Sequence, residues 1–194
     1  MAQKVSTEGG VNRAASAFLL GVCVVQVIAS IRTTKVEENA IGAAVCLIAF
    51  LHYLWMQGAN STTMQELRYS DWIVTCPLLL WELHKISGQE TKKSLGWPVV
   101  SVIAMLIFGF FSEAASLDPK SRKTMFIAGC VAFVACVLSF LPHVKQNHTL
   151  VYAFFVVWSL YPFASWSKNN AMLSMLDMLS KGGFGLYIAT NAMS

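Results

Sequence analysis

The chain has 194 residues, of which 56% are hydrophobic and only 12% charged, and its mean hydropathy is +0.56. This composition excludes an ordinary soluble domain and predicts a chain that lies in a lipid bilayer. The net charge of +4 is modest, and no basic run with stacking aromatics occurs, so we expect no nucleic-acid partner.

Apolar segments of about 20 residues, the length that crosses a bilayer, recur along the whole chain. Seven are expected, near 14–32, 38–57, 68–86, 97–115, 123–142, 148–167 and 171–190. They use nearly all residues, so we predict an all-α membrane protein in which residues 1–194 form one seven-helix domain. A short link, Gln57 to Glu66, is expected between the second and third helices.

The first segment is almost wholly apolar, and we expect it to face lipid or another subunit. The second segment opens with Glu37 and Glu38. Carboxylates in a first turn stabilise the positive end of the helix dipole, although Glu38 could instead point into the bundle and relay protons. His52 lies near the far end of this segment, either as a neutral core histidine or as the titratable partner of a carboxylate.

The third segment carries polar side chains at helical spacing. Offsets of three, seven and fourteen residues nearly complete whole turns, so one face should hold Arg68, Asp71, Thr75 and Glu82. At ~1.5 Å per residue, the backbones of Asp71 and Glu82 are separated by roughly 16 Å along the axis. Two carboxylates spaced in this way, with a threonine between them, suit a stepwise proton path.

The seventh segment contains Asp177 and Lys181 among apolar residues. Charges inside a membrane helix are costly unless they pair, and the spacing of four residues puts both side chains on one face. A lysine in this position serves either as half of an ion pair in a transport path or as an amine that forms a Schiff base.

Two motifs resemble the type 1 (microbial) rhodopsins, with bacteriorhodopsin and proteorhodopsin as functional models. One is Arg-Tyr-x-Asp-Trp-x-x-Thr-x-Pro-Leu-Leu-Leu-x-Glu, from Arg68 to Glu82, and the other is Asp-x-x-x-Lys-Gly-Gly-Phe-Gly, from Asp177 to Gly185. His52 and the following tyrosine resemble the same stretch of proteorhodopsins. The short links resemble those of some viral rhodopsins.

The resemblance implies that Lys181 binds all-trans retinal covalently as a protonated Schiff base. It also implies that Asp71 and Asp177 are the counter-ions, with Arg68 beneath them. A cationic imine in a dry interior keeps its proton only when an anion is close. The residues that match the retinal pocket are Trp72, Thr75, Leu79, Met105, Gly109, Trp158, Tyr161 and Pro162. Leu79 matches the position that carries leucine in green-absorbing proteorhodopsins.

The function that the resemblance implies is a light-driven outward proton pump, a transporter rather than an enzyme. Asp71 would accept the proton and Glu82 would resupply it, with Glu38 as the competing donor. The alternatives are a light-gated ion channel and a photosensory rhodopsin, and acids at helix ends such as Glu113 could line a channel. The connection 165–170 contains no acid to match the proton-release glutamates of bacteriorhodopsin.

Orientation follows from the resemblance, which implies an outside N-terminus and a cytoplasmic C-terminus. The positive-inside rule does not decide the orientation, because the two sets of loops carry similar numbers of lysines and arginines. The resemblance further implies a homo-oligomer, a trimer or a pentamer, in the bilayer, with protons as the transported ion.

Overall fold

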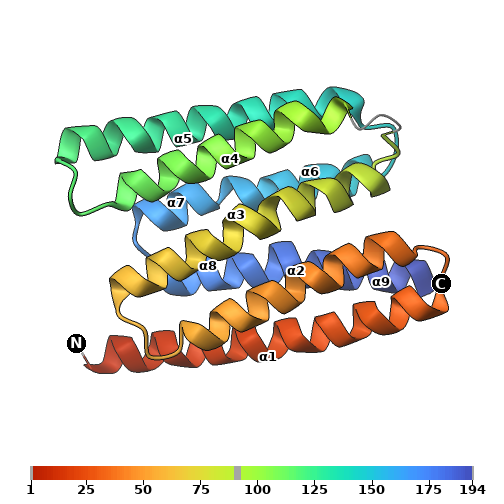
Figure 1. The fold of residues 1–194 in the computed structure, drawn as a ribbon, viewed down its shortest axis with the longest axis horizontal. Coiled ribbons are helices and arrows are strands. Elements are labelled where there is room, and N and C mark those ends of the chain that lie inside the picture. The colour runs from red at the N-terminus through yellow and green to blue at the C-terminus, as the bar shows by residue number, and fades with distance from the viewer. Residues whose placement is uncertain (1, 90–92, 194) are drawn as a thin grey trace. The chain divides into compact units, whose positions relative to one another are not determined.

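The computed structural model describes residues 2–89 and 93–193, and the regular elements in those ranges are all helices (Figure 1). In chain order these are α1 (Ala2–Arg32), α2 (Val36–Trp55), α3 (Ser61–Ile86), α4 (Lys93–Glu113), α5 (Pro119–Phe140), η1 (Leu141–His143), α6 (His148–Ser159), α7 (Tyr161–Trp166), α8 (Asn170–Asp177), η2 (Met178–Gly183) and α9 (Phe184–Met193). The sixth segment comprises α6 and α7, and the seventh comprises α8, η2 and α9. The predicted seven-helix, all-α architecture is confirmed.

Two of the predicted boundaries were wrong. Helix α1 begins at Ala2 instead of residue 14, because hydropathy marks only the apolar part of a helix. Helix α3 begins at Ser61, so the predicted link from Gln57 to Glu66 shrinks to residues 56–60. The Asn60 side chain accepts a hydrogen bond from the backbone N–H of Thr63 at 2.9 Å. This cap satisfies a backbone donor at the start of α3 and lets the helix form several residues earlier.

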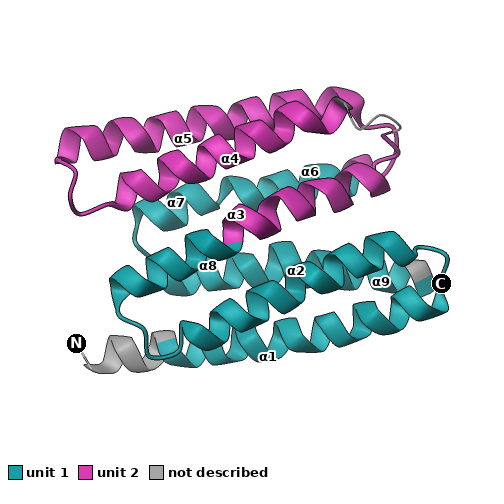
Figure 2. Cartoon of the chain, in the orientation of Figure 1, with its two compact units in different colours: residues 1–71, 149–194 teal, residues 72–148 magenta. Residues whose placement is uncertain are grey.

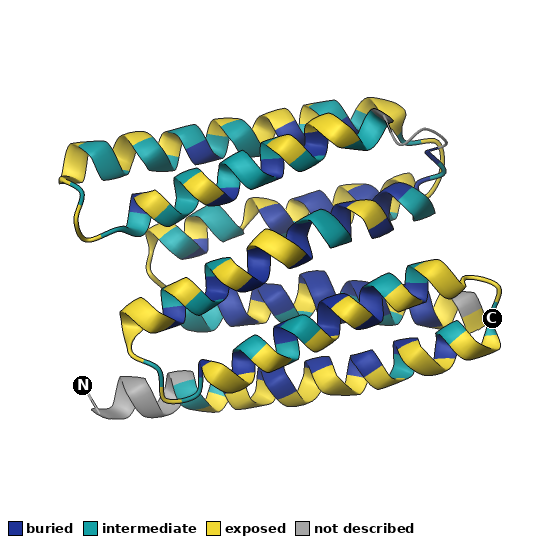
Figure 3. Cartoon of the chain, viewed as in Figure 1, coloured by how far each residue is buried: buried dark blue, intermediate teal, exposed yellow. Residues whose placement is uncertain are grey.

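The distribution of apolar surface is that of a membrane protein. Five helical segments among the described residues are long and apolar enough to cross a bilayer. Large apolar side chains remain exposed on these helices, whereas several polar and charged ones are buried (Figure 3). A bilayer solvates such apolar surfaces, while polar groups must find partners inside the protein. The chain is therefore an integral, multi-pass membrane protein.

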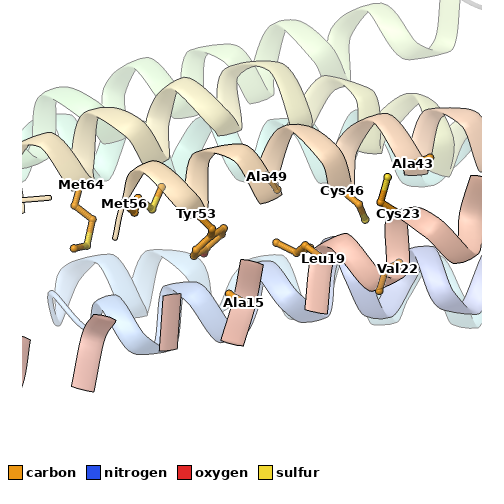
Figure 4. Close-up of a cluster of buried hydrophobic side chains, with 10 residues drawn as sticks. All are labelled: Ala15, Leu19, Val22, Cys23, Ala43, Cys46, Ala49, Tyr53, Met56 and Met64. Atoms are coloured by element: carbon orange, nitrogen blue, oxygen red, sulfur yellow. The ribbon is translucent and has the colours of Figure 1, made fainter. Parts of the chain in front are cut away.

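The chain divides into two compact units (Figure 2). The first contains α1, α2, the start of α3 up to Asp71, and everything from Thr149 onward. In it α1 packs along α2, and the side chains that meet are small or aliphatic (Figure 4). These contacts come from Ala15, Leu19 and Val22 of α1 and from Ala43, Cys46 and Ala49 of α2. Helix α1 also contacts α8, η2 and α9, so it supports the segment that carries Lys181.

The second unit contains α3 from Trp72 onward, α4, α5 and η1. Helices α4 and α5 pack along each other. A Cβ atom on Gly129 of α5 would lie 3.5 Å from the carbonyl oxygen of Met105 and 3.6 Å from the backbone nitrogen of Gly109. The two backbones therefore approach closely at this glycine. Met105 and Gly109 are half-buried, and within this unit their backbone packs against α5 at Gly129.

Gly182 gives a test of the packing between η2 and α1. A methyl group on Gly182 would collide with the Phe18 ring, whereas one on Gly183 would meet nothing closer than 3.8 Å. We expect Gly182→Ala to destabilise the protein by about 1–3 kcal/mol, the usual cost of overpacking. Gly183→Ala is the matched control and should change little. Thermal unfolding in detergent measures both, and equal melting temperatures for the two variants would contradict the packing.

Candidate functional site

A buried lysine lies at the centre of the first unit. Lys181 is 2% exposed and belongs to η2, a π-helical stretch between α8 and α9. Single π-helical turns inside α-helices often occur at functional sites. The Lys181 Nζ donates a hydrogen bond to Asp71 Oδ2 and lies 3.7 Å from Asp177 Oδ1. The predicted pairing of Asp177 with Lys181 is confirmed, and α3 supplies the second carboxylate.

Arg68 is the second cation of the site and is 3% exposed. Its Nη1 lies 3.8 Å from Asp177 Oδ2 and donates a hydrogen bond to the Tyr53 hydroxyl at 3.3 Å. Two cations therefore face two carboxylates, and the formal charges of Lys181, Arg68, Asp71 and Asp177 sum to zero. This balance matters because an unpaired charge in a low-dielectric interior is strongly destabilising.

Two phenols hold Asp177 in place. The Tyr53 hydroxyl donates to Asp177 Oδ2 at 2.7 Å, and the Tyr161 hydroxyl donates to Asp177 Oδ1 at 2.8 Å. Tyr161 also lies 2.8 Å from the Ser180 hydroxyl. Asp177 is thus bound by neutral donors on both oxygens, while Asp71 holds the amine. Tyr161 was predicted as a site residue, whereas Tyr53 was not. A phenol in an otherwise apolar segment, next to His52, could have indicated a buried hydrogen bond.

His52 and Glu38 have different places on α2. His52 is half-buried, its Nδ1 lies 2.9 Å from the Ile48 carbonyl oxygen, and it is close enough to Asp71 to interact electrostatically. It therefore joins the periphery of the site. Glu38 is half-buried in the first turn of α2, fourteen residues away, which corresponds to about 21 Å along a helix. The structure does not bring Glu38 to the lysine.

An aromatic cluster joins α6 to α9. The Phe154 ring lies with its centroid 4.6 Å from that of Trp158 and 4.9 Å from that of Phe184. All three side chains are buried. The predicted Trp-x-x-Tyr-Pro motif spans the break at Leu160, with Trp158 in α6 and Pro162 at the start of α7. Phe184 was named only as part of the motif from Asp177 to Gly185, and Phe154 was missed, because an aromatic residue in an apolar segment carries no sequence signal of its own.

The predicted polar face of α3 is confirmed. Arg68 and Asp71 are buried in the first unit, and the same face continues into the second unit with buried side chains throughout. These are Trp72 (6% exposed), Thr75 (0%), Leu79 (1%) and Glu82 (0%). Such a face would be unstable toward lipid, so it must lie against protein.

The site has the chemistry of a covalent anchor and a proton relay. A buried primary amine can condense with a carbonyl compound to an imine, and a carboxylate beside it can accept the nitrogen's proton. The aromatic cluster on α6 and α9 supplies flat apolar surface, and its member Phe184 follows Lys181 by three residues.

Comparison with known proteins agrees with this chemistry. Residues 11–194 match the family described as bacteriorhodopsin-like protein. The green-light absorbing proteorhodopsin of gamma-proteobacterium EBAC31A08 is 27% identical, with 73% of this chain and 68% of that protein covered. Sensory rhodopsin-2 of Natronomonas pharaonis is 25% identical, with 82% and 74% covered. The crystal structure of the proton pumping rhodopsin AR2 from the marine alga Acetabularia acetabulum is 26% identical, covers 95% of each chain and has a TM-score of 0.79.

The charge balance of the site is testable in the ligand-free protein. Asp71→Asn leaves two cations against one carboxylate, and Lys181→Met leaves two carboxylates against one cation. Each should lower the free energy of unfolding by about 3–5 kcal/mol. The double variant restores neutrality and should cost clearly less than the sum of the two. Denaturant unfolding in detergent measures the cycle, with the exposed Lys120→Met as control. Additive effects would contradict the pairing.

Proposed function

The chain belongs to the bacteriorhodopsin-like family of microbial rhodopsins, and from this premise we propose that it binds all-trans retinal through Lys181 and pumps protons outward in response to light. The observation that carries the proposal is the buried amine of Lys181, hydrogen-bonded to Asp71 and close to Asp177. Proton pumping by the algal rhodopsin, which is 26% identical over 95% of this chain, supports the same function.

Lys181 holds retinal through its side-chain nitrogen, and we assign the buried, mutually packed rings of Trp158, Phe154 and Phe184 to the apolar lining of the retinal. By resemblance to the family, Trp72, Thr75, Leu79, Met105, Gly109, Tyr161 and Pro162 are the further residues assigned to retinal binding. Retinal, when bound, supplies light absorption and a change of shape that reorients the Lys181 nitrogen. The remaining steps are proton transfers between residues of this chain.

Asp71 accepts the proton from the Lys181 nitrogen. Its Oδ2 receives the hydrogen bond from Nζ, so an acceptor already lies beside the nitrogen. Asp177 receives hydrogen bonds from two phenol hydroxyls and lies 3.8 Å from Arg68, so we assign it the role of counter-ion during this step. The proposal therefore makes Asp71 the first acceptor of the proton.

Glu82 returns the proton to Lys181. It follows Asp71 by eleven residues on α3, about 16 Å along the axis, and is fully buried. Its helix neighbours Leu79, Leu80 and Leu83 are also buried, and desolvation of this kind favours a neutral carboxylic acid that can donate. Glu38 is half-buried at a helix start, so its carboxylate is solvated more easily.

The proposed direction of transport requires the N-terminus outside and the C-terminus in the cytoplasm. Glu82 then lies toward the cytoplasm from Asp71, and protons leave on the side of the α1 start. A homotrimer or homopentamer in the bilayer is the proposed assembly, since exposed apolar faces suit lipid or neighbouring subunits equally.

A photosensory function is the second candidate. Sensory rhodopsin-2 of Natronomonas pharaonis covers 82% of this chain, more than the 73% covered by the proteorhodopsin. In a sensor the same buried charges would bias a conformational equilibrium instead of driving net transport. A steady proton current separates the two functions, because a sensor carries little current.

Light-driven pumping predicts that illuminated cells containing the protein, supplied with retinal, acidify their medium. A protonophore should abolish the signal, because it short-circuits any proton gradient. Lys181→Met is the inactive control. Alkalinisation of the medium, or a complete photocycle without a proton signal, would contradict the proposal. A voltage-clamp current that reverses with the ion gradient would point to a channel instead.

The donor assignment predicts different effects for two glutamates. Glu82→Gln should slow the return of a proton to Lys181 about 100-fold, the typical contribution of a positioned acid, and make that step depend on external pH. Glu38→Gln should change it less than about twofold. Flash photolysis measures both rates. The opposite ranking would move the donor from α3 to α2.

A further inference from the structure

Polar residues on three helices lead away from Asp177 toward the start of α1. In each helix two polar side chains follow each other after three or four residues, so that both lie on one face. The pairs are Asp177 and Ser174 on α8, Ser16 and Asn12 on α1, and Tyr53 on α2 with Gln57, which follows the end of that helix. None of these residues except Asp177 is charged, and all belong to the first unit.

Ser174 connects the three helices. Its hydroxyl is 3.1 Å from Asn12 Oδ1 and 3.0 Å from the Asn170 carbonyl oxygen, and Ser174 interacts electrostatically with the Tyr53 side chain. The hydroxyl has one proton, so it can donate to only one of these groups at a time. Ser174 is 1% exposed, which leaves it no access to bulk water. Its hydroxyl can donate to Asn12 on α1 or to the Asn170 carbonyl oxygen of its own helix.

Asn12, Ser16 and Gln57 lie between Ser174 and the protein surface in the proposed order of residues. Asn12 is 2% exposed, and its Nδ2 has no hydrogen-bond partner within the described part of the protein. Buried amide groups are almost always satisfied, and a bound water is the usual partner where the protein offers none. Four residues after Asn12 on α1, Ser16 Oγ lies 3.4 Å from Gln57 Nε2. Gln57 is half-buried and is followed by the exposed Gly58, so the path reaches solvent there.

We propose that the residues Tyr53, Ser174, Asn12, Ser16 and Gln57 form the proton-release path of this protein, between α1, α2 and α8. The inference rests on the proposed pump function and names its exit. It also accounts for the connection 165–170, in which no acid is present to serve as a release group.

The hydrogen bonds indicate how the path works. While Asp177 is ionised, Tyr53 donates to it and the path is closed. When Asp177 receives a proton from the Lys181–Asp71 pair, it donates to the Tyr53 oxygen, and the Tyr53 hydroxyl proton passes to Ser174. Ser174 in turn gives its own proton to the water held at Asn12. Each hydroxyl loses one proton and gains one, so a single proton moves outward and Asp177 returns to its ionised form.

The test uses Ser174→Ala and Asn12→Leu in the full, retinal-loaded protein in lipid vesicles. After a flash, a pH-sensitive dye reports proton release, and absorption reports loss of the proton from Lys181. Both variants should lengthen the delay between the two events about tenfold, equivalent to about 1.4 kcal/mol in the barrier. Ser174→Thr keeps the hydroxyl and should restore the delay of the unmodified protein. Ser30→Ala removes an α1 hydroxyl that bonds the Val27 carbonyl of its own helix, and it should change nothing.

A second readout does not depend on light. In the dark, in the retinal-free protein, exchange of the Tyr53 hydroxyl proton with D₂O, followed by NMR, should slow in the same two variants. Unchanged release and unchanged exchange in both would overturn the proposed path while leaving the pump intact. If the unmodified protein releases no proton at all, the pump proposal fails, and the exchange rates still decide whether the path is connected to water. Gln57→Leu, at a half-buried position, replaces either variant that does not fold.

Discussion

The rest of the structure depends on one ammonium group held inside a membrane protein. Moving an unpaired ammonium from water into a low-dielectric interior costs at least several kcal/mol. Two carboxylates offset this cost for Lys181: Asp71 accepts a hydrogen bond from the amine, and Asp177 lies 3.7 Å away. Arg68, 3.8 Å from Asp177, supplies the second cation that balances the second carboxylate. The four groups therefore stabilise one another, and removing any of them leaves an uncompensated charge.

This balance explains where the polar surface lies. Five other helical segments are long and apolar enough to cross a bilayer, whereas α3 and α8 with η2 carry the charged residues of the site, and these are buried. The lipid-compatible helices α1 and α2 supply the small side chains against which the seventh segment packs. Close approach at Gly182 and Phe18 fixes the π-helical stretch that carries Lys181. Packing thus keeps the amine at the carboxylates.

The same site separates the roles of two chemically identical carboxylates. Asp177 receives hydrogen bonds from Tyr53 and Tyr161, whereas Asp71 receives one from the amine itself. Ser174, three residues before Asp177 on α8, donates a hydrogen bond to Asn12 of α1. In the proposed release path, a proton that reaches Asp177 meets neutral groups that can exchange hydrogen bonds without acquiring lasting charge, which is the least costly way to cross a dry region.

The sequence by itself determined the seven segments, the pairing of Asp177 with Lys181 and the buried face of α3, because hydropathy and helical period are local properties of the chain. It also identified the family through residues 68–82 and 177–185. Helix capping at Asn60 shifted a boundary that hydropathy alone could not locate. Only the tertiary structure decided that Tyr53 holds Asp177, that Phe154 meets Phe184, and that Asn12 contacts Ser174 across 162 positions. These contacts join residues on different helices, and no periodicity within one segment can encode which side chains meet after the helices pack.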